Sequence, residues 1–166
     1  MKTKLVLAVC MLLIGVAPIC AASYGTDFSG TWVLDKDRSF SNPAGLDQTL
    51  VVTQTGDQLK VDVRLVTAQG GERTLTETYV LDGKETDFTP VGAQEGTKGK
   101  RKASWLPDHR GILVDDEITS TTPQGSTVQK VARKWTLSAD GKTLTVDYYF
   151  DNQQGSFEAK RVFAKK

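Results

Sequence analysis

A charged residue within an apolar row is the first candidate for chemistry in this sequence. Arg161 alternates with three apolar residues, Phe157, Ala159 and Phe163. Every second residue of a strand lies on the same face, so the alternation predicts that Arg161 points to the buried side. An unpartnered interior guanidinium costs several kcal/mol. We therefore expect a partner, either the ring of Trp32 together with backbone carbonyls or the acidic group of a bound ligand.

A second candidate is a pair of opposite charges on two separate segments. Arg133 alternates with Trp135, and Glu77 alternates with Tyr79. If both rows face inward, Arg133 and Glu77 pair across the interior, or Arg133 meets a ligand acid. Either arrangement indicates an interior that is not purely apolar.

The remaining polar groups predict no catalytic or metal site. His109 is the single histidine and stands in a Pro-Asp-His-Arg-Gly turn, so a zinc site would need carboxylates almost alone. The acidic run Asp115-Asp116-Glu117 is interpreted as a solvated strand face. No Gly-x-Ser-x-Gly motif, phosphate loop or dinucleotide fingerprint is present. We expect no catalytic residues, no metal and no cofactor.

The first residues have the pattern of a secretory signal peptide. Lys2 and Lys4 precede the apolar stretch Leu5–Ala17, and small residues suited to cleavage follow at Ala21 and Ala22. The stretch is too short and wrongly flanked for a membrane span. We predict a signal peptide over residues 1–22, cleaved after Ala21 or Ala22, and one domain over 23–166 that is secreted or periplasmic.

Both cysteines, Cys10 and Cys20, fall within that leader, so the mature domain is expected to fold without a disulfide. Cys20 has an alternative interpretation as a lipid-anchor site, although the residue before it is Ile19 rather than a small one. Removing Lys2 and Lys4 lowers the basic count from 21 to 19, against 20 acidic residues. No net field favours nucleic acid or an anionic membrane.

From residue 28 onward, short alternating runs are separated by turn residues. The clearest run is Leu59–Leu65, in which four apolar residues alternate with three charges. Gly, Asp and Asn stand between the runs, as tight hairpin turns require. No sustained helical period is present. The expected strands cover residues 28–34, 50–55, 59–66, 74–81, 86–88, 102–106, 112–119, 128–137, 143–150 and 157–164.

Connections this short join antiparallel neighbours, so the strands form a meander. Closing the meander into a barrel removes its open edges and covers its apolar face, and a two-sheet sandwich is the alternative. Residues 35–47 are expected to form an irregular segment with a short helical turn or lid. Residues 90–99 are the second irregular segment. The basic run Lys98–Lys102 is interpreted as a solvated strand edge.

The motif Phe28-Ser29-Gly30-Thr31-Trp32 near the start and Arg161 in the last strand resemble the lipocalin and fatty-acid-binding (calycin) superfamily, in particular its small secreted bacterial members. The resemblance implies an all-β, antiparallel up-and-down barrel of about 8–10 strands. In it, Gly30 and Trp32 are structural. Residues 35–47 are too short for the helix-turn-helix lid of the fatty-acid-binding branch. That branch closes with Arg-x-Tyr, whereas this chain has Phe163 and lacks the hydroxyl.

We therefore predict a monomeric, non-catalytic barrel that binds a small hydrophobic or amphipathic ligand, including an anionic one. The predicted ligand-binding residues are Tyr79, Trp105, Trp135 and Phe163 in the wall, with Arg133 and Arg161 for an acidic group. The first alternative is a filled barrel acting as a protein-interaction or inhibitor module of the cell envelope. A small enzyme at the barrel mouth and a transmembrane β-barrel are the others. Against the last, the aromatic residues form no paired girdles.

Overall fold

The computed structural model describes residues 25–41, 46–123 and 125–166, and all regular secondary structure in them is β. The predicted leader, with Cys10 and Cys20, lies outside the described residues. The strands are β1 (Gly30–Phe40), β2 (Asp47–Thr55), β3 (Gln58–Val66), β4 (Glu72–Val80), β5 (Asp82–Phe88), β6 (Thr97–Trp105), β7 (Gly111–Thr122), β8 (Gly125–Leu137), β9 (Thr143–Asn152) and β10 (Gly155–Lys165).

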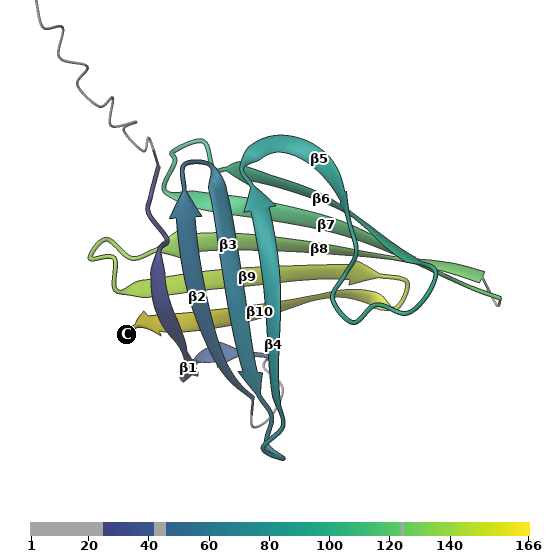
Figure 1. Ribbon diagram of the computed structural model, residues 1–166, viewed down its shortest axis with the longest axis horizontal. Coiled ribbons are helices and arrows are strands. Elements are labelled where there is room, and N and C mark those ends of the chain that lie inside the picture. Colours follow the sequence, from purple (N-terminus) through teal and green to yellow (C-terminus); the bar gives the residue numbers. More distant parts are fainter. Residues whose placement is uncertain (1–24, 42–45, 124) are drawn as a thin grey trace, which may run out of the picture.

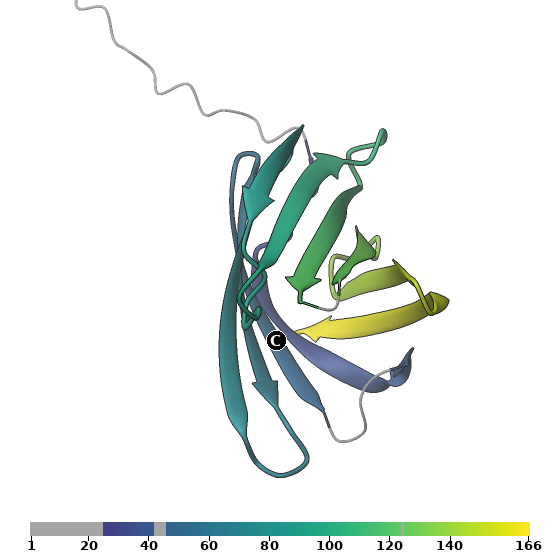
Figure 2. The same cartoon turned by 90° about the vertical axis from the view of Figure 1, so that its right-hand side faces the viewer.

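Each strand pairs antiparallel with its neighbour along the chain, except β4 with β5, and β1 pairs with β10. The sheet order is therefore β4-β3-β2-β1-β10-β9-β8-β7-β6-β5, a nearly closed barrel whose two free edges are β4 and β5. Strands β1 to β4 run across strands β6 to β10 (Figure 1), and the two groups curve around a shared interior (Figure 2). The predicted all-β, up-and-down antiparallel barrel is confirmed.

Strand β1 extends farther than the sequence analysis expected. It continues to Phe40, and its pairing with β10 shifts between Asp35 and Phe40. Ser39 holds this irregularity, because its Oγ donates to the Asp35 carbonyl at 2.6 Å and accepts from the Val162 amide at 2.9 Å. The prediction of an irregular segment over 35–47 is thus wrong for its first part. Residues 42–45 lie outside the described part.

The apolar core fills one end of the barrel, called here the closed end. It is the end with the β2–β3, β4–β5, β6–β7 and β8–β9 turns. The core includes Trp32 and Phe163, both fully buried, and the indole N–H of Trp32 donates to the Phe28 carbonyl at 2.9 Å. A Cβ on Gly30 would lie 2.8 Å from Lys165 Cε, so glycine permits the close approach of β10. The structural roles of Gly30 and Trp32 stay predictions.

The predicted contact between Arg161 and Trp32 is wrong. Trp32 lies opposite Lys165 in the β1–β10 register, and the Lys165 ammonium lies 5.1 Å from the indole centroid. Arg161 precedes Lys165 on β10 by four residues, which is about 13 Å at the rise of an extended strand. The sequence indicated that the first and last strands carry these residues, but it did not contain the register between them.

The residues before β1 cover the closed end. The Thr26 amide donates to the His109 carbonyl at 3.0 Å, which ties this segment to the β6–β7 turn. The ring of Phe28 lies 6.2 Å from both Trp105 and Trp135. The predicted exposed position of His109 is confirmed. This end of the barrel is therefore filled by side chains.

Replacing Trp32 should show how much the closed end contributes to stability. We expect Trp32→Ala to lower the free energy of unfolding by about 3–5 kcal/mol. Trp32→Phe, which mainly removes the indole N–H donor, should cost about 1–2 kcal/mol. The exposed neighbour Val33 provides the control, because Val33→Ala should change stability by about 0.5 kcal/mol or less. Urea denaturation measures all three, and equal losses for Trp32→Ala and Val33→Ala would contradict this assignment.

Candidate ligand-binding site

Four charged side chains and a tyrosine form an ion network across the barrel interior. Asp116 on β7 accepts two hydrogen bonds from Arg101 on β6, at 2.7 and 2.8 Å, and it also contacts Arg133 on β8. Arg133 donates to Glu77 on β4 at 2.9 Å and to the Tyr79 hydroxyl at 3.2 Å. The predicted pair of Arg133 and Glu77 is therefore confirmed.

The ion network compensates its own charge. Arg101 and Arg133 face the two carboxylates of Asp116 and Glu77, and the Tyr79 hydroxyl contacts Glu77. Burial raises the pKa of Glu77, but the attraction of Arg133 and Arg101 and the hydrogen bond from Tyr79 outweigh it, so the pKa lies below its ordinary value. Burial likewise raises the pKa of the Tyr79 hydroxyl, which stays protonated.

Two members of the ion network were assigned to solvent by the sequence analysis, and both assignments are wrong. Arg101 belongs to the basic run interpreted as a strand edge, and Asp116 to the acidic run interpreted as a wet face. Their residue exposures are 7% and 6%. The signal was present, because Arg101 alternates with Gly99 and Ala103 while the lysines occupy the other face. The many charges in the run made this alternation hard to recognise in the sequence.

Arg161 lies apart from the ion network. Its guanidinium carbon is 4.6 Å from the ring centroid of Tyr148 on β9. Its buried Nε has no hydrogen-bond partner. Within the described ranges, no carboxylate lies within ion-pair distance of this guanidinium. Arg161 is therefore a partly buried cation whose charge, among the residues that the structure describes, is compensated by the face of an aromatic ring alone.

The four predicted wall residues lie in or next to the packed core. Tyr79, Trp135 and Phe163 are 0–3% exposed and belong to the core cluster. Trp105 is partly exposed, and its indole N–H donates to Asp57 Oδ1 at 2.9 Å at the closed end. These four residues form the floor below the site rather than its open wall. Arg133, predicted to be available to a ligand, is committed to the ion network.

The half of the interior away from the closed end, called here the open half, has an aromatic wall that the sequence did not predict. It consists of Tyr148 and Phe150 on β9 and Phe157 on β10, together called the aromatic wall. Phe150 pairs with Phe157 across the strands, and Phe157 is 52% exposed. Alternation with the buried Leu144 and Val146 was the available signal, because period two places all four residues of β9 on one face.

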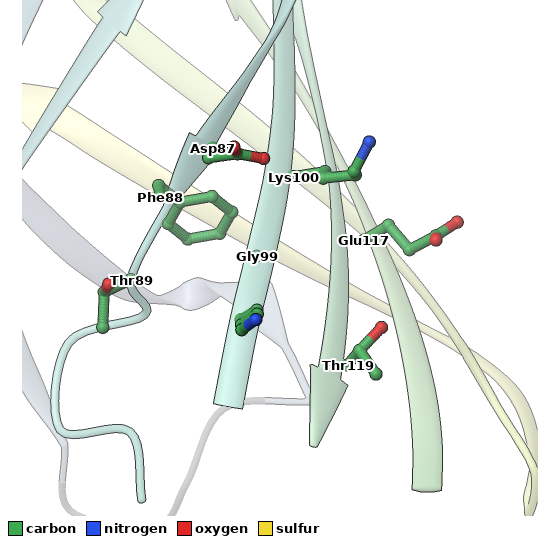
Figure 3. Close-up of a pocket in the computed structure, with 8 residues that line it drawn as sticks. Asp87, Phe88, Thr89, Gly99, Lys100, Glu117 and Thr119 are labelled. Carbon is green, nitrogen blue, oxygen red and sulfur yellow. The ribbon is translucent and has the colours of Figure 1, made fainter. Parts of the chain in front are cut away.

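A separate groove of about 570 Å³ lies over β5, β6 and β7. Figure 3 shows Asp87, Lys100 and Glu117 along it, with the Phe88 ring facing the strand at Gly99. A Cβ on Gly99 would lie 2.4 Å from the Phe88 ring, so the ring occupies the place of a side chain. The charges in the groove are of both signs, and Lys100 is paired with Glu85 at 2.6 Å. The other charged residues of the groove, among them Lys98 and Asp87, are exposed to solvent, whereas Arg161 is partly buried.

The described ranges contain neither a cluster of metal ligands nor a membrane-spanning helix. No group of three or more His, Cys, Asp or Glu side chains is arranged to hold a metal ion. Of the residues placed by the structure, none forms a helix long and apolar enough to cross a membrane.

Comparisons with known proteins gave one kind of match. No family model and no curated protein matches the chain. Among solved structures, the chain is similar to the zebrafish ileal bile acid-binding protein complexed with cholic acid. The sequences are 18% identical, the TM-score is 0.49, and the alignment covers 84% of this chain and 98% of that one.

The ion network predicts a specific dependence of stability on pH. Arg133→Met leaves Glu77 and Asp116 with one cation, so we expect a loss of about 3–5 kcal/mol near neutral pH. Because the folded pKa of Glu77 is lowered, its contribution is present above its unfolded pKa and is lost as the pH falls through the folded value. The loss caused by Arg133→Met should therefore shrink on acidification, as measured by urea denaturation at several pH values.

Two variants act as controls for that experiment. Glu77→Gln removes the titrating group, so its stability should change less with pH over the same range. Arg64→Met breaks an exposed ion pair with Glu72 on the outer face and should cost about 1 kcal/mol or less. An Arg133→Met loss that stays constant with pH would contradict the role given to Glu77.

Proposed function

We propose that this protein binds a small amphipathic anion in the open half of its barrel and does not transform it chemically. The acidic group of the ligand contacts Arg161, and its apolar part lies against the aromatic wall. The packed residues Tyr79, Trp135 and Phe163 form the floor below the ligand. Concave apolar sites with a few polar groups are the usual form of small-molecule sites.

The observation that carries the proposal is the uncompensated charge of Arg161. The four charges of the ion network balance one another, whereas Arg161 contacts the Tyr148 ring and, among the described residues, no carboxylate. Its buried Nε, like that of Arg133, has no acceptor there. A buried donor without a partner costs about 1–3 kcal/mol and more when charged. An anionic ligand removes that cost, because a carboxylate accepts from a guanidinium through two parallel hydrogen bonds.

Tyr148 supports an acid-binding role in a second way. In the fatty-acid-binding resemblance, the residue two positions after the arginine is tyrosine, and here it is Phe163, which is fully buried. Tyr148 on the neighbouring strand instead places its aromatic ring against Arg161, while its hydroxyl lies close enough to Arg133 to interact with that charge. Within the described part of the chain, no hydrogen bond to that hydroxyl is present, so it is available to a ligand oxygen.

The alternative of a filled barrel that acts through its surface is favoured by one observation. The closed end is packed with fully buried side chains, including Phe28, Trp32 and Phe163. A barrel filled in the same way along its whole length would have no room for a ligand. The partial exposure of the inward-facing Arg161 and Phe157 favours ligand binding over that alternative.

We also propose that the protein acts outside the cytoplasm, as a secreted or periplasmic protein. The support is the sequence pattern of residues 1–22, with Lys2 and Lys4 before an apolar stretch and small residues at the expected cleavage position. A monomer is proposed together with this location.

Replacing Arg161 tests the binding proposal directly. Calorimetry with decanoate and decanol should show that Arg161→Gln lowers the affinity for decanoate about 10- to 100-fold, the effect of losing a charged hydrogen-bond donor. The affinity for decanol should stay unchanged, because it carries no charge. The matched control is Lys160→Gln, which removes a positive charge from the adjacent, outward-facing position and should alter neither affinity. The proposal fails if the unmodified protein binds neither amphiphile.

The location can be tested by expressing the full chain in a bacterial host. We expect the protein in the periplasmic fraction or the medium, with an intact mass that begins at Ala22 or Ser23. A variant with Lys2 and Lys4 replaced by glutamate should keep its leader and stay in the cytoplasm, because the positive start is removed. Recovery of the uncleaved chain from the cytoplasm in the unmodified form would contradict the predicted signal peptide.

A further inference from the structure

The rings of the aromatic wall are nearly parallel. Tyr148 and Phe150 lie 5.8 Å apart, centroid to centroid, with 6° between their planes. Phe150 and Phe157 lie 4.5 Å apart with 11° between their planes. The guanidinium of Arg161 lies over the Tyr148 ring. A continuous row of flat groups therefore leads from the cation to Phe157, which is near the β9–β10 turn at the open end.

The closed end is packed differently, although one pair there, Phe28 and Trp105, is also stacked, with 27° between the ring planes. There the ring of Trp135 meets Phe28 at 86° and Tyr79 at 75°, and all three side chains are almost fully buried. Edge-to-face contacts of this kind fill space. The aromatic wall instead ends in Phe157, which is 52% exposed. The row thus ends in a half-exposed ring.

The positions of the two ends of this row specify a length. Phe157 and Arg161 lie on the same face of β10, four residues apart, with the small Ala159 between them. An extended strand rises about 3.3 Å per residue, so the two positions are separated by about 13 Å. The Arg161 guanidinium lies over Tyr148, which stands opposite Ala159, so a ligand that contacts both ends carries its acid and its distal group at most about that far apart.

We propose that the ligand is an elongated anion with a planar ring at the end opposite its acidic group. The acid contacts Arg161 in the interior, and the ring stacks with Phe157 at the open end. This inference rests on the proposed function and adds to it the chemical class of the distal group, the length of the ligand and its orientation. A plain alkyl chain fits the same path but makes no ring contact with Phe157.

A series of ω-phenylalkanoates of increasing chain length tests the inference, with unbranched alkanoates of matched carbon number as references. Calorimetry on the full mature protein should show a gain of about three- to tenfold for the phenyl compounds over their references, the size of one aromatic pair. The gain should be absent from the shortest compounds and reach its maximum at a separation of ring and acid no greater than about 13 Å. Phe157→Leu should abolish this gain of the phenyl compounds over their references, whatever its effect on the plain alkanoates.

The matched control is Tyr149→Leu. Tyr149 is also an exposed aromatic residue, at 46%, but it lies on the opposite face of β9 from Tyr148 and Phe150, so the gain should persist. Two negative results differ in meaning. If neither series binds, the proposed function itself is overturned. If both series bind through Arg161, but the phenyl group adds nothing at any length or Phe157→Leu has no effect on the gain, the inference about the ring is overturned alone.

Discussion

The rest of this structure depends on the compensation of charges that the barrel encloses. The strands β4 and β5 do not pair, so backbone hydrogen bonds do not close the cylinder there. Side chains bridge the gap instead, because Glu77 on β4 contacts Arg133 on β8 at 2.9 Å and Arg101 on β6 at 3.8 Å. Burying these groups separately would be costly. The attraction between Glu77 on β4 and the two arginines on β6 and β8 therefore holds the two edges of the sheet at a fixed distance from each other.

The two ends of the interior differ in how completely their side chains are buried and in how their aromatic rings pack. Toward the closed end, apolar side chains such as Trp32 and Ile112 are fully buried, and the Trp135 ring meets its aromatic neighbours edge to face. Toward the open end, inward-facing residues are only partly covered, and the rings of the aromatic wall are nearly parallel. The closed end thus contributes most of the buried apolar surface, and the open end presents the half-exposed side chains. A binding function uses this division, because ligand exchange need not disturb the packed core.

Arg161 and Arg133 illustrate how similar residues acquire different roles. Both arginines alternate with apolar residues, Arg133 on β8 and Arg161 on β10, so the sequence pattern predicts the same inward direction for both. Arg133 has two carboxylates within contact distance, which leaves its charge satisfied. Arg161 has the ring of Tyr148 and no carboxylate in the described ranges. Only the second has charge left for an external partner.

The alternation of residues by itself indicated the strands and the inward direction of Arg133, Glu77 and Arg161, because a period of two is a local property of extended backbone. The short connections indicated the antiparallel order. Tertiary structure alone decided which strand residues stand opposite one another. It placed Lys165 rather than Arg161 at Trp32, and it brought Arg101 and Asp116 together inside a barrel although their neighbours are charged. These contacts join residues on different strands, and register between strands follows from packing and turn geometry that no single segment contains.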